Sequence, residues 1–236
     1  MFLLRAPMGG NKKGTISQNT ASTYFSILKA GLKQAFVDEY LTVDIGAKVK
    51  GITNIEKTRV ALSMNEVQML VDTPCKDDVL KRAFLFSILT GLRHSDIQTL
   101  KWKQIQQTSK GTWQAVIVQQ KTKRPDYKPV IQQALQLCGE RPNDEETLVF
   151  EGLTDASWIS RPLKVWIEAS GIKKHITFHC GRHSFASLLL ENGVDIYTIK
   201  DLMGHTNVRT TQIYTHIVNE QKEKAANTLH IENLTL

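Results

Sequence analysis

The chain has 236 residues and a mass of 26.7 kDa, which is enough for one full globular domain and part of another. Its 30 Lys and Arg exceed its 23 Asp and Glu, and the net charge of +7 disfavours an acidic extracellular module but admits a polyanionic partner. The longest apolar stretch, near Ala83–Leu89, is too short to span a membrane, and three cysteines without a CxxC pair are typical of a reducing cytoplasm rather than of disulfides or structural zinc.

The first 62 residues form the more basic part of the chain. They hold nine Lys and Arg against four Asp and Glu, whereas residues 63–236 hold 21 against 19. Apolar side chains at helical spacing predict a helix from about Asn19 to Glu39. Residues 42–62 show no period, and we interpret them as an extended basic linker, although a solvated loop explains their charge equally well.

Capping signals predict the next two helices. Ser63 and Glu66 form a capping box, in which each side chain satisfies a free backbone amide, and a helix to about Val71 should follow. A second helix is expected over Asp77–Thr90, because acidic residues occupy its first turn and Gly91 follows its last residue.

The remaining elements give the fold class. Two segments rich in β-branched residues, with a short Lys/Arg/Pro turn between them, predict antiparallel strands over Trp113–Gln120 and Tyr127–Ile131. Four more helices are expected over Ser157–Ser170, Phe178–Glu191, Asp195–Met203 and Val208–Val218. The sequence therefore predicts a mainly α protein with a small antiparallel β-sheet, in the α+β class.

Three histidines that recur every four residues are a candidate metal site. His175, His179 and His183 would stack on one face of a single helix, and such a stack could bind zinc. Thr177, however, has the character of a helix N-cap and places His175 outside the helix. No Asp or Glu accompanies the other two histidines, so the sequence favours no metal here.

The last two predicted helices suggest a function of another class. Joined by a short turn at Gly204, they resemble a helix-turn-helix whose second helix enters the major groove of DNA. Against this, Gln212, Tyr214 and His216 alternate with apolar residues, and His205 in the turn has no obvious task in a groove. Taken alone, this segment leaves a DNA-binding regulator open.

Four segments in chain order resemble the motifs of the tyrosine recombinase (phage integrase) family. They are TGLRHSDI over Thr90–Ile97, QQKTK over Gln119–Lys123, HCGRHSFA over His179–Ala186, and LMGHTNVRTTQIYTH over Leu202–His216. The spacings also agree: three residues from His179 to Arg182, 23 from there to His205, and nine more to Tyr214. The first and third motifs are most similar to those of integrases from conjugative transposons and related mobile elements.

The resemblance implies a domain organisation. Residues 63–236 would be the catalytic domain, and residues 1–62 would be part of the family's helical core-binding, DNA-binding domain together with the basic linker. That domain usually has several helices, whereas only one is predicted here. Gly181 stands where the family more often has Leu, which indicates a change in packing.

The resemblance also implies an activity. The chain would be a site-specific recombinase, an integrase that cleaves and rejoins double-stranded DNA through a 3′-phosphotyrosine intermediate during integration or excision of a mobile element. A tetramer on two DNA duplexes is implied, in the bacterial cytoplasm and associated with the nucleoid. No cofactor or metal is implied, because the phosphotyrosine bond conserves the energy for religation. The alternative is a non-catalytic helix-turn-helix regulator.

Phosphoryl transfer explains why the family needs two arginines and a histidine. Its transition state concentrates negative charge on the non-bridging phosphate oxygens. Planar guanidiniums hold such oxygens bidentately and stay charged at any working pH, which suits Arg93 and Arg182. His205, just beyond a helix end, would donate a third hydrogen bond to the same oxygens.

The other predicted site residues handle protons. Tyr214 would be the nucleophile, and His179 would be its base or proton acceptor because imidazole titrates near neutrality. Lys121 on the hairpin would protonate the leaving 5′ oxygen, with Lys123 as the next candidate. His183 is expected to make a structural hydrogen bond rather than to act in catalysis.

Overall fold

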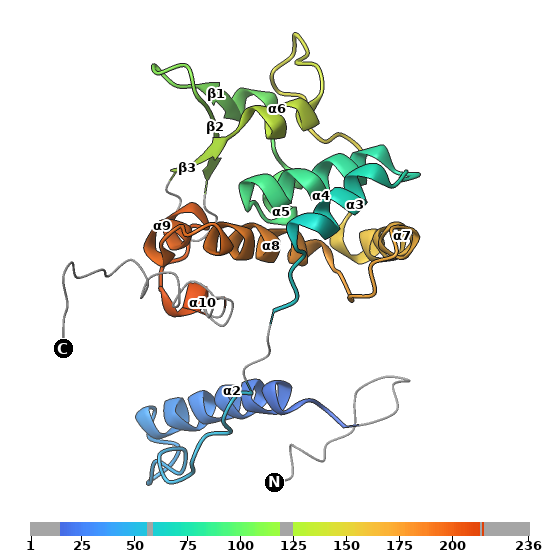
Figure 1. The fold of residues 1–236 in the computed structure, drawn as a ribbon. Helices are drawn as coiled ribbons and strands as arrows, with labels where there is room; N and C mark the ends of the chain where they lie inside the picture. The colour runs from blue at the N-terminus through green and yellow to red at the C-terminus, as the bar shows by residue number, and fades with distance from the viewer. Residues whose placement is uncertain (1–14, 56–58, 119–124, 213, 215–236) are drawn as a thin grey trace, which may run out of the picture. The chain divides into compact units, whose positions relative to one another are not determined.

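The computed structural model describes residues 15–55, 59–118, 125–212 and 214. The chain forms two compact units, residues 1–57 and 58–236 (Figure 1). The sequence placed the division slightly later, at residues 62–63. Leu62 belongs to the second unit because its side chain is buried in the core and its backbone N–H donates to Ser184 Oγ at 2.8 Å.

The first unit contains one long helix, α2, which spans Gln18–Val37. It begins at Ser17, whose hydroxyl accepts a hydrogen bond from the backbone N–H of Thr20, as expected of an N-cap serine. Most of its surface is open, and large side chains such as Tyr24 and Ile27 are more than half exposed. The helix predicted from the apolar spacing is therefore confirmed, but its apolar residues form little core.

The segment after α2 folds back along the helix instead of forming a free linker. Side chains of α2 satisfy its backbone over residues 49–55, which lack a regular strand or helix of their own. These bonds run from Gln18 Nε2 to Thr53 O at 2.7 Å, from Ser22 Oγ to Ile52 O at 2.7 Å, from Lys29 Nζ to Val49 O at 2.8 Å and, reciprocally, between the Asn19 amide and the backbone of Ile55 at 2.8 and 2.9 Å.

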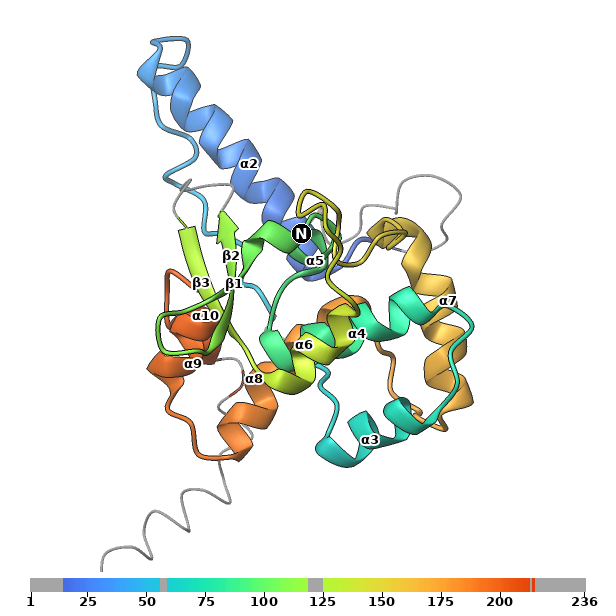
Figure 2. The ribbon, with the colours of Figure 1, turned by 90° about the horizontal axis from the view of Figure 1, so that it is seen from above.

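The second unit is mainly helical with a small sheet. Its helices are α3 (Met64–Asp72), α4 (Asp78–Thr90), α5 (His94–Gln98), α6 (Gln132–Cys138), α7 (Ala156–Ala169), α8 (Phe178–Glu191), α9 (Ile196–Leu202) and α10 (Arg209–Gln212), with a 3₁₀ turn at Trp102–Gln104. The sheet has three antiparallel strands in the order β1 (Ile105–Gln107), β2 (Trp113–Val118), β3 (Pro125–Val130). The predicted fold class is confirmed. The sheet, α9 and α10 gather toward one end of α8, and α7 lies toward the other (Figure 1, Figure 2).

Helices α4 and α8 pack against each other at the centre of the second unit. The Phe84 ring makes edge-on contacts with Trp166 and Phe178, at centroid distances of 5.9 and 5.5 Å. Gly181 allows the two helices to approach closely, because a Cβ there would lie 3.2 Å from Ser87 Oγ and 3.3 Å from the Phe84 ring. This packing accounts for the glycine that departs from the family pattern.

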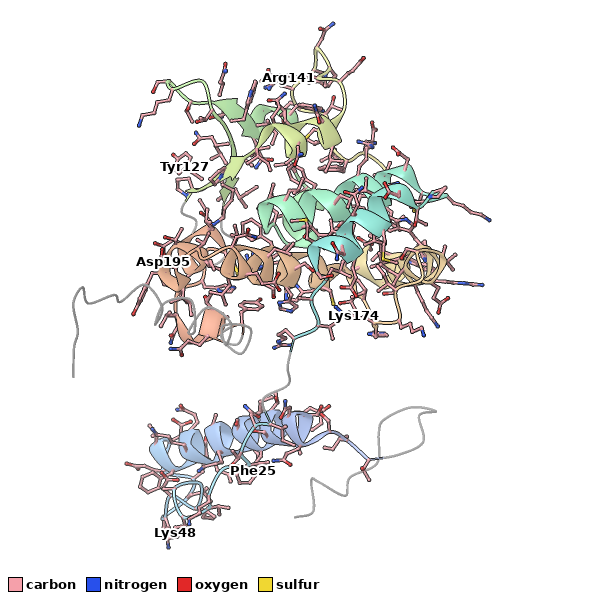
Figure 3. All side chains as sticks on the ribbon, in the orientation of Figure 1. Phe25, Lys48, Tyr127, Arg141, Lys174 and Asp195 are labelled. Carbon is pink, nitrogen blue, oxygen red and sulfur yellow. The ribbon has the colours of Figure 1, made fainter. Side chains whose placement is uncertain are left out.

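The described part of the hairpin pairs in register, with Trp113 opposite Val130 and Val116 opposite Tyr127. Side chains alternate along β3: Lys128 and Val130 are buried, whereas Tyr127 is 58% exposed and projects from the other face (Figure 3). The sheet therefore turns one face of β3 toward the helices.

Predicted and observed elements differ mainly in the short ones. The capping box at Ser63 and the glycine stop at Gly91 are both present. Helices α5 and α6 and strand β1 were not predicted. The helix expected over Val208–Val218 is observed as α10, and its residues beyond Tyr214 lie outside the described ranges. Over the residues that the structure covers, no helix has both the length and the apolarity required to cross a membrane.

Candidate functional site

A cleft of about 530 Å³ opens in the second unit, where the loop before α5, strands β2 and β3, helix α8 and the turn after α9 meet. Its lining contains basic side chains, acidic side chains and a histidine. The ionisable residues along it are Arg93, Asp96, Asp126, Lys128, Arg182 and His205. Three predicted site residues from distant parts of the sequence, Arg93, Arg182 and His205, therefore meet in one place.

The loop before α5 depends on Gly91. This residue ends α4 in the left-handed conformation, with a φ of 69°, and a Cβ on it would lie 2.5 Å from the Phe185 ring. The chain then turns so that Arg93 precedes α5 as its N-cap residue. The Arg93 side chain is 47% exposed and lies 3.8 Å from Asp96 Oδ2, so its guanidinium can reach an anion in the cleft.

Arg182 is held rigidly beneath the cleft. Its side chain is almost fully buried and donates to Gly91 O at 2.5 Å and to Met203 O. These carbonyls belong to the ends of α4 and α9, so one guanidinium fixes both ends. Burial and the nearby Arg93 lower the pKa of Arg182 to about 10, which leaves it charged at neutral pH.

His205 follows α9 directly and is placed by two bonds. Its backbone N–H donates to Lys200 O at 3.0 Å, and its Nδ1 lies 3.0 Å from Thr211 Oγ1. Burial, then the charges of Arg182 and Arg93, lower the pKa of His205 to about 4, so its imidazole is neutral at pH 7. In the tautomer that carries its ring proton on Nε2, Nδ1 accepts a hydrogen bond from Thr211 and Nε2–H is left to donate to a ligand in the cleft.

Lys128 was missed by the sequence analysis. Its side chain is only 4% exposed, and its Nζ lies 2.8 Å from Asp126 Oδ2 and 3.1 Å from Asp201 O. Desolvation lowers its pKa, while the Asp126 carboxylate acts in the opposite direction. The available signal was the alternation of β3, in which Lys128 occupies the same inward face as Val130.

Tyr214 does not line the cleft. It is 2% exposed, and its hydroxyl lies 2.5 Å from His183 Nδ1. Burial raises the pKa of Tyr214 to about 12, and the charges of Arg182 and Arg59 only partly oppose this effect. It belongs to a small buried cluster with Ala186, Leu190, Ile199 and Met203. The structure therefore holds the predicted nucleophile neutral and beside α8.

The histidine that contacts Tyr214 is His183. Burial and the neighbouring His179 lower the pKa of His183 to about 3, so its imidazole is neutral at pH 7 and its Nδ1 can accept a hydrogen bond from the Tyr214 hydroxyl. The rings of His179 and His183 meet edge-on at a centroid distance of 4.5 Å. Desolvation and Arg182 also lower the pKa of His179. Its predicted role as a base stays a prediction.

Two predicted residues, Lys121 and Lys123, lie outside the described ranges, and their roles stay predictions. Thr177 is the N-cap of α8, so His175 precedes the helix, as the sequence indicated. Within the described residues, no group of three or more His, Cys, Asp or Glu side chains could hold a metal ion.

Comparison with known sequences identifies one family. The model of the phage integrase family matches residues 61–221. A tyrosine recombinase XerD from Listeria monocytogenes serotype 4b (strain F2365) is 29% identical over 235 residues, an alignment that covers 92% of this chain and 76% of the relative. A tyrosine recombinase XerD from Lacticaseibacillus casei is 50% identical over 62 residues, which cover 26% of this chain and 21% of the relative.

Solved structures share the fold. A lambda integrase (75–356) dimer bound to a COC′ core site superposes with a TM-score of 0.67 at 20% identity, covering 84% of this chain and 73% of that one. The XerH site-specific recombinase bound to palindromic difH substrate, in a post-cleavage complex, superposes with a TM-score of 0.60 at 18% identity, covering 90% of this chain and 72% of that one.

Proposed function

Because this chain belongs to the phage integrase family and is a tyrosine-type site-specific recombinase, we propose that it cleaves and rejoins double-stranded DNA through a 3′-phosphotyrosine intermediate on Tyr214. One observation carries the proposal beyond family membership. Arg93, Arg182 and His205, which lie on three separate segments, converge on one cleft. Cations and a neutral hydrogen-bond donor around one cleft suit a phosphodiester.

The cleft residues would stabilise the charge that develops on the scissile phosphate. Arg182 is anchored by two backbone carbonyls, so it needs little reorganisation when the phosphate binds. Arg93 is exposed enough to close on the phosphate from the other side. His205 Nε2 supplies a further hydrogen bond to a non-bridging oxygen. These groups provide the positive charge that a metal provides in many nucleases.

The reaction is a balanced exchange of esters. The Tyr214 oxygen attacks phosphorus, a new O–P bond forms, and the bond from phosphorus to the 5′ oxygen breaks. The phenol proton passes to His179, and the 5′ oxygen takes a proton from Lys121. Since Tyr214 is bonded to His183 in the resting chain, it must leave this position before it attacks.

The finer assignment concerns the biological role. We propose integration and excision of a mobile element, on the strength of the motifs TGLRHSDI and HCGRHSFA. The solved relatives include a lambda integrase tetramer bound to a Holliday junction, and we propose a tetramer on two duplexes for this chain too. Residues 1–57 would then add DNA contacts as part of a core-binding domain. The reaction would take place in the bacterial cytoplasm, on nucleoid DNA.

A covalent-capture experiment tests the activity without knowledge of the target site. The chain is incubated with a pool of duplexes of randomised sequence, each nicked in one strand. After cleavage near the nick, the short fragment that carries the freed 5′ hydroxyl diffuses away, so the covalent intermediate cannot be religated. DNA that stays attached to protein in SDS is recovered and sequenced. We expect a protease-sensitive adduct enriched in one sequence. Recovered sites at the ends of a mobile element would support the finer assignment, and sites elsewhere would contradict it.

Tyr214→Phe is the matched control, because it removes one oxygen and leaves the ring to pack. DNA binding should stay near the wild-type level, since affinity rests mainly on Lys and Arg contacts to phosphates. The adduct should vanish, and wild-type cleavage should persist in EDTA. A helix-turn-helix regulator would give no adduct with either protein, and an adduct formed by Tyr214→Phe would overturn the choice of nucleophile.

A further inference from the structure

A buried lysine in the cleft has no role in the chemistry described above. Lys128 Nζ bonds the Asp126 carboxylate on its own strand and the backbone carbonyl of Asp201 in α9. The second bond joins positions 73 residues apart in the sequence. It is therefore a tertiary connection between the sheet and the end of α9, one turn before His205.

Stability alone does not account for a lysine at this position. Lys128 lies on the inward face of β3, where its neighbour Val130 is apolar and buried. Burying an ammonium group costs solvation free energy, and an apolar residue of similar volume often stabilises a fold at least as well as a buried ion pair. An effect of Lys128 on the position or the pKa of a neighbouring side chain is the better explanation.

We propose that Lys128 is a positioning residue for His205: by bonding Asp201 O it ties the end of α9 to β3 and holds the turn that carries His205 against the cleft. Arg182 donates to Met203 O at the same end of α9. The last turn of α9 thus has two cationic anchors, one from the sheet and one from α8. This inference rests on the proposed function, in which His205 contacts the scissile phosphate.

The cleft also places Lys128 among the groups that set the charge state of His205. Its ammonium group acts with two arginines to disfavour the imidazolium form. Asp126 partly offsets Lys128, because the two form an ion pair. The described charged and titratable groups that line the cleft or act on His205 are Arg93, Asp96, Asp126, Lys128, His179 and Arg182.

A histidine titration by NMR tests the connection in the free protein. Lys128→Met removes one positive charge, so the pKa of His205 should rise. Asp126→Asn removes the opposing negative charge, so the pKa should fall further. Lys103→Met, which removes a lysine paired with Glu146 outside the cleft, should leave it unchanged. The His205 signal is assigned by its loss in His205→Gln.

The covalent-capture assay gives the second readout. Lys128→Met should form adduct roughly 10- to 100-fold more slowly than wild type, because small displacements of a catalytic group have effects of this size. DNA affinity should change little. The double variant Lys128→Met/Asp126→Asn removes both members of the ion pair, so loss of the hydrogen bond to Asp201 O can be separated from a folding defect. It should remain slow while unfolding like the wild type.

The outcomes separate this proposal from the one on which it rests. If wild type forms no adduct, the proposed function fails, and the titration still tests the link between Lys128 and His205. If wild type forms adduct and the double variant is as fast, Lys128 is not a positioning residue. A His205 pKa that moves the same way in Lys128→Met and Asp126→Asn would also overturn the proposal.

Discussion

The cleft and the pocket of Tyr214 are assembled in opposite ways. In the cleft, Arg182 and His205 are already fixed by bonds to the ends of α4 and α9 and to Thr211. Around Tyr214, the hydroxyl that we propose as the nucleophile is buried, is hydrogen-bonded to His183, and has a raised pKa. The residues of the proposed phosphate site are therefore already positioned in the free chain, whereas the proposed nucleophile is buried away from the cleft.

This contrast indicates where DNA must act. In the proposed reaction, the scissile phosphate meets Arg182 and His205 already in place, whereas attack by Tyr214 requires its hydrogen bond to His183 to break. The two halves meet on α8, which carries both Arg182 and His183 on consecutive positions. Substitutions on either side should thus separate preparation of the phosphate site from release of the tyrosine.

The largest effect should come from the cleft. Arg182→Gln removes the guanidinium charge and should slow adduct formation roughly 10²- to 10³-fold, the usual loss for one donor to a developing oxyanion. Arg161→Gln, an exposed position on α7, is the matched control. The phenolate titration of Tyr214 should still show a raised pKa. Adduct formation by Arg182→Gln at the wild-type rate would remove Arg182 from the site.

The backbone beneath Arg182 should show the next largest effect. In Gly91→Ala, a left-handed φ and a Cβ 2.5 Å from Phe185 should together lower the free energy of unfolding by about 2–4 kcal/mol. Gly152→Ala has a similar φ of 86° with no atom within 4 Å, so it should lose only the backbone part. Urea unfolding measures both. Equal losses would mean that the Phe185 contact is unimportant.

Acid should weaken both regions through their histidines. The pKa values of His183 and His205 are about 3 and 4, below the ordinary value of about 6.5. Folding therefore disfavours their protonation. The contribution that the two neutral histidines make to the free energy of unfolding is complete above pH 6.5 and should be lost as the pH falls toward 4. Unfolding free energies at stepped pH check this. His205→Gln should flatten the decline, and His175→Gln, at an exposed position, should not.

The smallest effect should appear in alkali and should report on the tyrosine alone. Folding raises the pKa of Tyr214 from about 10 to about 12, so its stabilising contribution is complete below pH 10 and is lost between pH 10 and 12. Ultraviolet titration of phenolate, as the difference between wild type and Tyr214→Phe, measures the shift. Tyr40→Phe, at a position 84% exposed, is the control. A Tyr214 signal that titrates near pH 10 would contradict burial.

Local signals explain the elements that the sequence predicted. Helix ends are set by residues close to them in the sequence. Side chains cap the starts of α3 and α4, at Ser63 with Glu66 and at Asp77, and the left-handed Gly91 ends α4. The unpredicted α5 and β1 have only five and three residues, which is less than the apolar repeat needs to be recognised. Their existence depends on tertiary packing.

The site divides in the same way. The spacing of motifs indicated Arg93, Arg182, His205 and Tyr214, and three of these meet in the cleft. The hydrogen bonds from Lys128 to Asp201 O and between Tyr214 and His183 join residues that are far apart in the chain. No local sequence pattern specifies such pairs, because they form only when the chain folds. The same holds for residues 49–55, whose backbone is satisfied by α2 side chains at distant positions.

The attachment of the chain just before α3 has a mechanical consequence. Leu62 N–H is bonded to Ser184 Oγ in the middle of α8, and Lys174, labelled in Figure 3, bonds the carbonyl of Ala61 at 3.0 Å. Tension along residues 59–60 would therefore reach α8 directly, before any turn of α3 unwinds. Since Ser184 is two residues from Arg182 and one from His183, a pull on this segment would strain the helix at the residues that serve the cleft and restrain the tyrosine.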